Sequence, residues 1–163
     1  MSFIAPEPPL VVTVPPSDPA GEDQVDAGDF WPSVDLALMR ATVRLDGTVT
    51  PERLRHAVVE ALAFVIDQLA AWEAARRAQG YATLAAVPAR QIDGKSINEQ
   101  RYLRAVYSLA KADLIERYRD YDTSAQGDKD AEQLVDQIAE QRRNMAWAIQ
   151  DIKGARRTTV DLI

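Results

Sequence analysis

The residue types that most often perform chemistry in enzymes are scarce in this chain. It has 163 residues, no cysteine and a single histidine, His56. Ser–His–Asp catalysis would have to be built around His56, and the Gly-x-Ser-x-Gly turn that presents a nucleophilic serine does not occur. His56 adjoins apolar residues in a helical pattern, which is typical of a surface or boundary position. We therefore expect no catalytic residues, and we predict that the protein is not an enzyme.

The residues that build metal, nucleotide and cofactor sites are equally scarce. Zinc usually takes His or Cys ligands, and the chain offers one such residue. The aspartates between residues 120 and 130 lack the order of an EF-hand loop and its terminal Glu. The smallest separation between glycines, from Gly21 to Gly28, is seven positions, so neither phosphate-binding glycine motif can occur. We expect no metal ion and no cofactor.

Arginines are the remaining candidate binding groups. A helix-turn-helix could be drawn through residues 33–60, because two arginine pairs lie in that stretch. The pairs are Arg40 with Arg44 and Arg53 with Arg55. The first interpretation is a DNA-binding regulator, and the second is solvated faces or contacts between subunits.

The distribution of charge favours the second interpretation. The net charge is −6, and residues 1–30 hold six of the 25 acidic residues and no Lys or Arg. The rest of the chain is left with 19 acidic residues against 19 Lys and Arg. A duplex-binding protein normally carries a basic surplus, since phosphate neutralisation supplies most of its affinity.

One long helix dominates the predicted architecture. Thr50 can cap its start, and Pro51 suits the first helical position. Apolar residues then recur at spacings of three and four, and Gly80 can end the helix in a left-handed conformation. The apolar face is Leu54, Val58, Leu62, Val65, Leu69 and Trp72. A second, alanine-rich surface consists of Ala61, Ala63, Ala70, Ala71, Ala74 and Ala75.

Further helices complete an all-α prediction with at most one short strand. Ser33 can cap a short helix that runs to about Leu45. The sequence Ser96-Ile97-Asn98-Glu99 is a capping box that starts a helix to about Tyr118. A last helix covers residues 128–153, with Gly154 as its C-cap. The expected faces are Leu103, Tyr107, Ala110, Leu114 and Tyr118, widened by Val106 and Leu109, and then Leu134, Ile138, Met145, Ile149 and Ile152.

The two ends of the chain are expected to lie outside this small helical bundle. Residues 1–29 are acidic and contain six prolines, which predicts a disordered arm. Residues 30–153 form the helical body, anchored at its start by Phe30-Trp31, and residues 154–163 form an extended tail. We predict an assembly interface at Arg157, Thr158, Thr159, Val160, Leu162, Ile163, Phe30 and Trp31. No membrane span or signal peptide is expected, because long apolar runs and a basic leader are absent.

As a set, several segments resemble one known family. The chain is similar to the head completion proteins of temperate, contractile-tailed phages, called phage GPL. The segments are DFWPSVD (29–35), RLDGTVTPERLR (44–55), GYATLAAVPARQIDG (80–94), YLRAVYSLAKADLIERYRDYDTSAQGDK (102–129) and RTTVDLI (157–163).

The resemblance implies a structural connector in the virion, assembled in the host cytoplasm. Such a protein docks below the portal after DNA packaging, at the head–tail junction, and carries the neck and tail terminator proteins. The implied fold is a small helical bundle of connector type. Twelve copies would form a ring that encloses DNA without sequence-specific binding, and the family brings no catalytic residues. A DNA-binding regulator using residues 33–60 and a soluble assembly chaperone are the alternatives.

Overall fold

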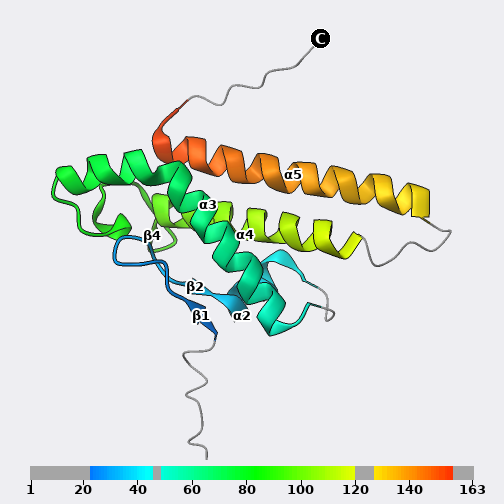
Figure 1. Cartoon of the computed structure of the whole chain (residues 1–163). Helices are drawn as coiled ribbons and strands as arrows, with labels where there is room; N and C mark the ends of the chain where they lie inside the picture. The colour runs from blue at the N-terminus through cyan, green and yellow to red at the C-terminus, as the bar shows by residue number, and fades with distance from the viewer. Residues whose placement is uncertain (1–22, 46–48, 120–126, 156–163) are drawn as a thin grey trace, which may run out of the picture.

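The protein is predominantly helical, as predicted. The computed structural model describes residues 23–45, 49–119 and 127–155. Helices α4 (Ile97–Arg119) and α5 (Gly127–Lys153) form an antiparallel pair, and α3 (Pro51–Ala78) crosses it (Figure 1). The shorter elements are α2 (Leu36–Val43), the 3₁₀ turn η1 (Leu84–Ala86) and the strands β1 (Gln24–Val25), β2 (Val34–Asp35), β3 (Gln91–Ile92) and β4 (Lys95–Ser96).

Helix α3 follows its sequence pattern closely. The Thr50 hydroxyl accepts a hydrogen bond from the Arg53 N–H at 3.4 Å, and Pro51 occupies the first turn. All five aliphatic residues of the predicted face are buried, from Leu54 to Leu69, and Trp72 is partly buried. The helix ends where Gly80 takes a φ of +92° and its N–H donates to the Arg77 carbonyl at 2.9 Å. The predicted core positions Leu62 and Leu69 are confirmed.

The short helix α2 begins at a different cap from the predicted one. Asp35 is the N-cap, and its carboxylate accepts a hydrogen bond from the Leu38 N–H at 2.8 Å. The predicted cap at Ser33 is wrong, because the next residue, Val34, is still extended and pairs with Val25. The Ser33 hydroxyl instead bonds to the Gln24 side-chain oxygen at 3.0 Å.

Two small antiparallel ribbons exceed the predicted limit of one short strand. The first pairs β1 with β2, and the second pairs β3 with β4. In the second ribbon, Asp93 and Gly94 both have positive φ, at 53° and 70°, which is the backbone of a tight hairpin turn. In the first ribbon, Val25 is buried and pairs with Val34. The packed body therefore begins before Phe30, within the range that the sequence assigned to the arm.

The α4–α5 pair largely matches the predicted helices. The Glu99 carboxylate accepts from the Ser96 N–H at 3.3 Å, as a capping box requires, but Ser96 Oγ accepts from the Asn98 N–H and not from Glu99. Gly154 follows α5 with a φ of +71°, as predicted for its C-cap. The predicted stripe on α4 omitted Tyr102, which is fully buried.

Candidate assembly interface

Phe30 and Trp31 lie inside the protein and not on its surface. Their exposed fractions are 2% and 5%, and their rings meet edge to face at 5.0 Å between centroids. Trp31 stacks on Tyr102 at 4.9 Å, and Trp72 lies 6.4 Å from both Phe30 and Trp31. The predicted role as an anchor for the start of the body is confirmed. Within the single chain these side chains leave little surface exposed, and their place in the predicted interface stays a prediction.

Two polar contacts hold this aromatic cluster to α3. The Trp31 indole N–H donates to Glu73 Oε2 at 2.8 Å, and the Arg77 guanidinium lies 5.0 Å from the centre of the Phe30 ring. Arg77 also forms an ion pair with Glu73 at 2.7 Å. The segment before β2 is thereby fixed to the C-terminal half of α3.

The aromatic cluster also encloses an unsatisfied hydroxyl. Tyr102 Oη has no hydrogen-bond partner among the described residues, and burial raises the pKa of this phenol. Burial also raises the pKa of Tyr107, with a further contribution from the negative charge of Asp35. Tyr102 therefore contributes an apolar ring to the core and a hydroxyl that nothing in the described structure uses.

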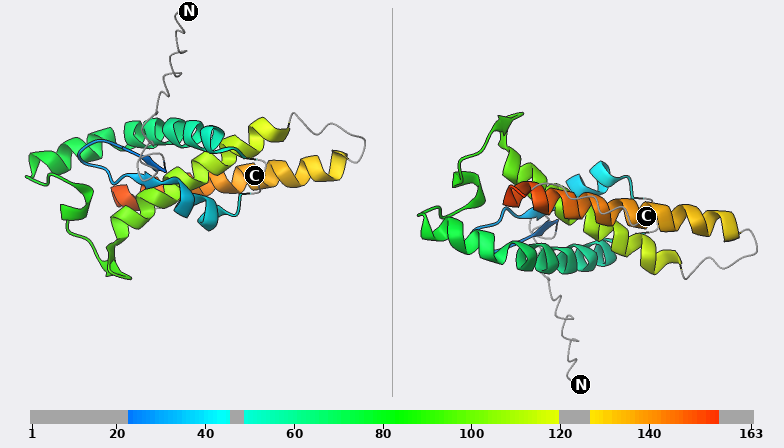
Figure 2. Two further views of the ribbon diagram at one scale, coloured as in Figure 1. Left: turned by 90° about the horizontal axis from the view of Figure 1, so that it is seen from below. Right: turned by 90° about the horizontal axis from the view of Figure 1, so that it is seen from above.

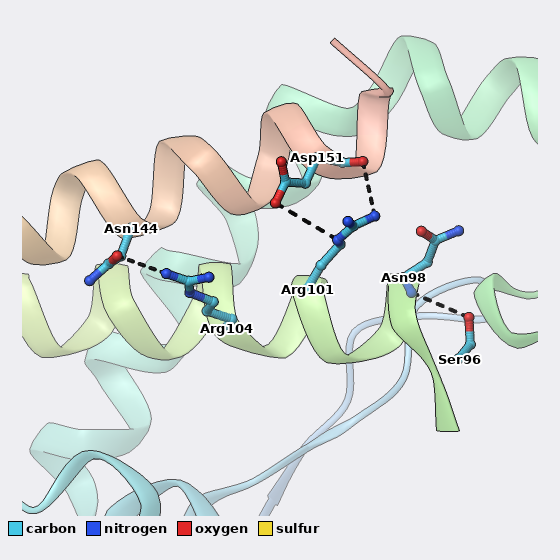
Figure 3. Close-up of polar contacts among 6 residues, drawn as sticks. All are labelled: Ser96, Asn98, Arg101, Arg104, Asn144 and Asp151. Carbon is cyan, nitrogen blue, oxygen red and sulfur yellow. Dashed lines mark hydrogen bonds and ion pairs between the residues drawn. The ribbon is translucent and has the colours of Figure 1, made fainter. Parts of the chain in front are cut away.

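A polar seam ties α4 to α5 near the C-terminal end of α5. Arg101 donates to the Asp151 carbonyl at 3.2 Å, with the Asp151 carboxylate 3.9 Å away, and Arg104 donates to the Asn144 side chain at 2.8 Å (Figure 3). The seam holds the last turns of α5 against α4. The six predicted C-terminal interface residues, Arg157, Thr158, Thr159, Val160, Leu162 and Ile163, come just after it and lie outside the described residues.

The arginines that suggested a helix-turn-helix are partly engaged within the chain. Arg40 donates to the Val49 carbonyl at 2.8 Å, and both terminal nitrogens of Arg55 donate to the Gln24 carbonyl at 3.0 Å. These two guanidinium groups stabilise the packing around α2 and β1. The observation disfavours α3 as a DNA-recognition helix.

The described part of the chain contains no cluster of three or more His, Cys, Asp or Glu that could hold a metal ion. His56 is exposed on α3 and belongs to no such cluster.

In residues 23–45, 49–119 and 127–155, no helix combines the length and apolarity that crossing a bilayer demands.

The surface carries apolar side chains that the sequence patterns did not single out. Within the described residues, five large hydrophobic side chains are 44–50% exposed. They are Leu38 on α2, Val59 and Phe64 on α3, Ile92 on β3 and Val135 on α5. The one available signal was the alanine-rich flank of α3: Ala63, Ala70, Ala71, Ala74 and Ala75 are exposed as a second surface, whereas Ala61 joins the core.

Comparison with known proteins identifies a family that matches most of the chain. The family described as phage head completion protein (GPL) matches residues 25–163. A protein of Escherichia phage P2 named "Head completion/stabilization protein" is 41% identical over 152 residues, which cover 93% of this chain and 90% of that protein. No solved structure matches the chain.

Proposed function

Because the chain belongs to the phage head completion protein (GPL) family, we propose that it docks below the portal after DNA packaging and forms a ring around the DNA channel. In this proposal the ring has twelve copies and provides the attachment site for the neck and tail at the head–tail junction of the virion. The general role, structural completion of the phage head, follows from membership of the family.

The extent of the match carries the proposal. It begins at Val25, in the first strand of the packed body, and continues to Ile163 at the end of the chain. The whole helical body therefore belongs to the family pattern. The relative from phage P2 extends the similarity over most of both chains.

The electrostatics of the body support a passive role around DNA. Outside residues 1–30 the acidic and basic residues balance, and Arg40 and Arg55 are bonded to main-chain oxygens. A channel wall without a strong positive field does not hold DNA tightly, so the genome can pass.

Deletion of the gene, with complementation by a tagged copy, tests the proposal. Without the protein we expect filled heads that do not join tails. Imaging of complemented particles with intact necks should then place the protein at the head–tail junction. If the protein is absent from purified particles while joining is restored, it acts as an assembly chaperone. If the purified protein binds duplex DNA with an affinity that falls steeply with salt, the regulator is correct instead.

A further inference from the structure

Helix α2 turns an uncharged apolar face to the solvent. Leu36 and Met39 point into the core, which leaves Ala37, Leu38, Ala41 and Thr42 exposed. The Leu38 side chain is half exposed, at 50%, and is the most exposed large hydrophobic side chain among the described residues. The exposed residue Arg44 follows directly at the C-cap of the helix.

Helix α3 carries a larger apolar face on its outer side. Val59 and Phe64 are each 45% exposed, and the exposed alanines beyond them extend this face along the helix. Small side chains allow another helix to approach closely. The charged groups on the middle of this face are both acidic, Glu60 and Asp67, and they lie in line because seven residues make about two helical turns.

The two faces lie at different edges of the protein. Figure 1 shows α2 and the N-terminal half of α3 on the same side of the α4–α5 pair, and the views of Figure 2 show them on different sides of the line of α4. An interface between two different surfaces of identical chains repeats from copy to copy, and it closes into a ring when the rotation allows. Two distinct apolar faces at different places on the surface are what such an interface needs.

We propose that the α2 face of one copy packs onto the outer face of α3 in the next copy. This inference rests on the proposed ring and names the surfaces that build it. Leu38 would lie against Val59 and Ala63 of the neighbour, which are one helical turn apart, with Arg44 facing Glu60 or Asp67. An eight-residue helix is about 12 Å long, which fits within the span of about 24 Å from Val59 to Ala75.

Charge argues for this pairing over a symmetric contact between two α3 helices. An antiparallel α3–α3 dimer would bring Glu60 and Asp67 of one copy against Asp67 and Glu60 of the other. Like charges placed opposite each other in an interface are costly. Between its caps the α2 face has no charged side chain; Asp35 stands at its N-terminal end and Arg44 at its C-terminal end, so the proposed contact places the Arg44 end against Glu60 or Asp67.

Cysteine crosslinking of the full-length chain tests the interface, since the chain has no cysteine of its own. A chain that carries both Leu38→Cys and Ala63→Cys is assembled into heads, and these heads are treated with a short bis-maleimide. We expect a ladder of crosslinked multimers under denaturing electrophoresis. Each single variant should stay monomeric, and Leu38→Cys with Gln137→Cys on the exposed face of α5 is the matched control.

Three results would overturn the interface. The first is dimers formed by Ala63→Cys alone, which would show a symmetric α3 contact. The second is a double variant that stays monomeric in heads that contain the protein. The third is absence of the protein from heads, which removes the proposed function together with the ring.

The variant Leu38→Asp gives a second measurement. It should weaken self-association at least tenfold and leave the melting temperature unchanged. Unchanged association would also contradict the interface.

Discussion

At the scale of single residues, Tyr102 is where the core departs from ideal packing. Its ring stacks on Trp31, while its hydroxyl has no partner in the described structure. A buried polar group without a partner loses its hydrogen bonds to water and gains none in return. The ring therefore stabilises the fold and the hydroxyl opposes it.

Tyr102→Phe tests this division. The change keeps the stacked ring and removes the unsatisfied oxygen, so we expect the free energy of unfolding to stay the same or rise by about 1 kcal/mol. Urea unfolding followed by tryptophan fluorescence measures it. A loss of stability would show that the hydroxyl makes a bond that the described residues do not supply.

The raised pKa of Tyr102 and Tyr107 predicts a loss of stability in alkali. A phenol with a higher pKa in the folded state stays neutral there, while the unfolded chain begins to ionise near pH 10. The stabilisation is therefore complete below about pH 10 and falls as the pH rises toward the folded-state pKa. Melting temperatures between pH 8 and 11 should fall less steeply for Tyr102→Phe than for the parent. Identical slopes would contradict the assignment to Tyr102.

At the scale of elements, local capping decides where each helix begins. Thr50 was identifiable because Pro51 follows it directly, and α3 starts where the sequence predicts. Before α2, both Ser33 and Asp35 have suitable side chains. Pairing of Val34 with Val25 keeps the chain extended for two more residues, so Asp35 caps the helix.

Replacing each of these side chains separates the two candidate caps. Asp35→Ala removes the acceptor for the Leu38 N–H and should cost about 1 kcal/mol of unfolding free energy. Ser33→Ala removes an exposed side-chain bond and should change stability by less than about 0.5 kcal/mol. Chemical denaturation of both variants gives the comparison, and an equal effect of the two would contradict the assigned cap.

Adjacent positions on α3 test its two faces in the same way. Leu62 is 4% exposed and Ala63 is exposed. Leu62→Asp creates a cavity and buries a charge, so it should cost most of a typical margin of about 5–15 kcal/mol. Ala63→Asp should cost about 1 kcal/mol, because Asp has a lower helix propensity than Ala and is repelled by Glu60 and Asp67 one turn away. Thermal melts monitored by circular dichroism compare the two, and a Leu62→Asp protein that melts like the parent would refute the assigned face.

The elements that the sequence did not predict share a physical cause. Long helices repeat their apolar spacing over many turns, whereas a two-residue strand repeats nothing. Burial of Tyr102 depends on Trp31, which lies far away in the chain and reaches it only after the fold has formed. Val59 and Phe64 lie off the predicted apolar face of α3, and the spacing pattern did not mark them or Leu38 as an exposed apolar surface.

At the scale of the whole molecule, the fold separates a rigid body from the surfaces available to partners. The aromatic cluster and the α4–α5 seam fix the body internally. The exposed faces of α2 and α3 are the surfaces that contact neighbouring copies in the proposed ring. Helix α5 stops at Lys153, and the Ala155 N–H donates to the Gln150 carbonyl, so the helix ends at a defined point.

The last seven residues, Arg157 to Ile163, are predicted to serve assembly and not the fold of the monomer. Thr158, Thr159 and Val160 favour an extended backbone, whose amides need partners. Strand addition to a neighbour or to the portal would supply them, with Leu162 and Ile163 in an apolar pocket of that partner. Deleting residues 157–163 should leave the melting temperature unchanged and produce heads that fail to join tails. Complementation assays and melting curves of the same variant measure both properties. If stability falls sharply while joining persists in the protein that remains folded, the segment belongs to the core of its own chain.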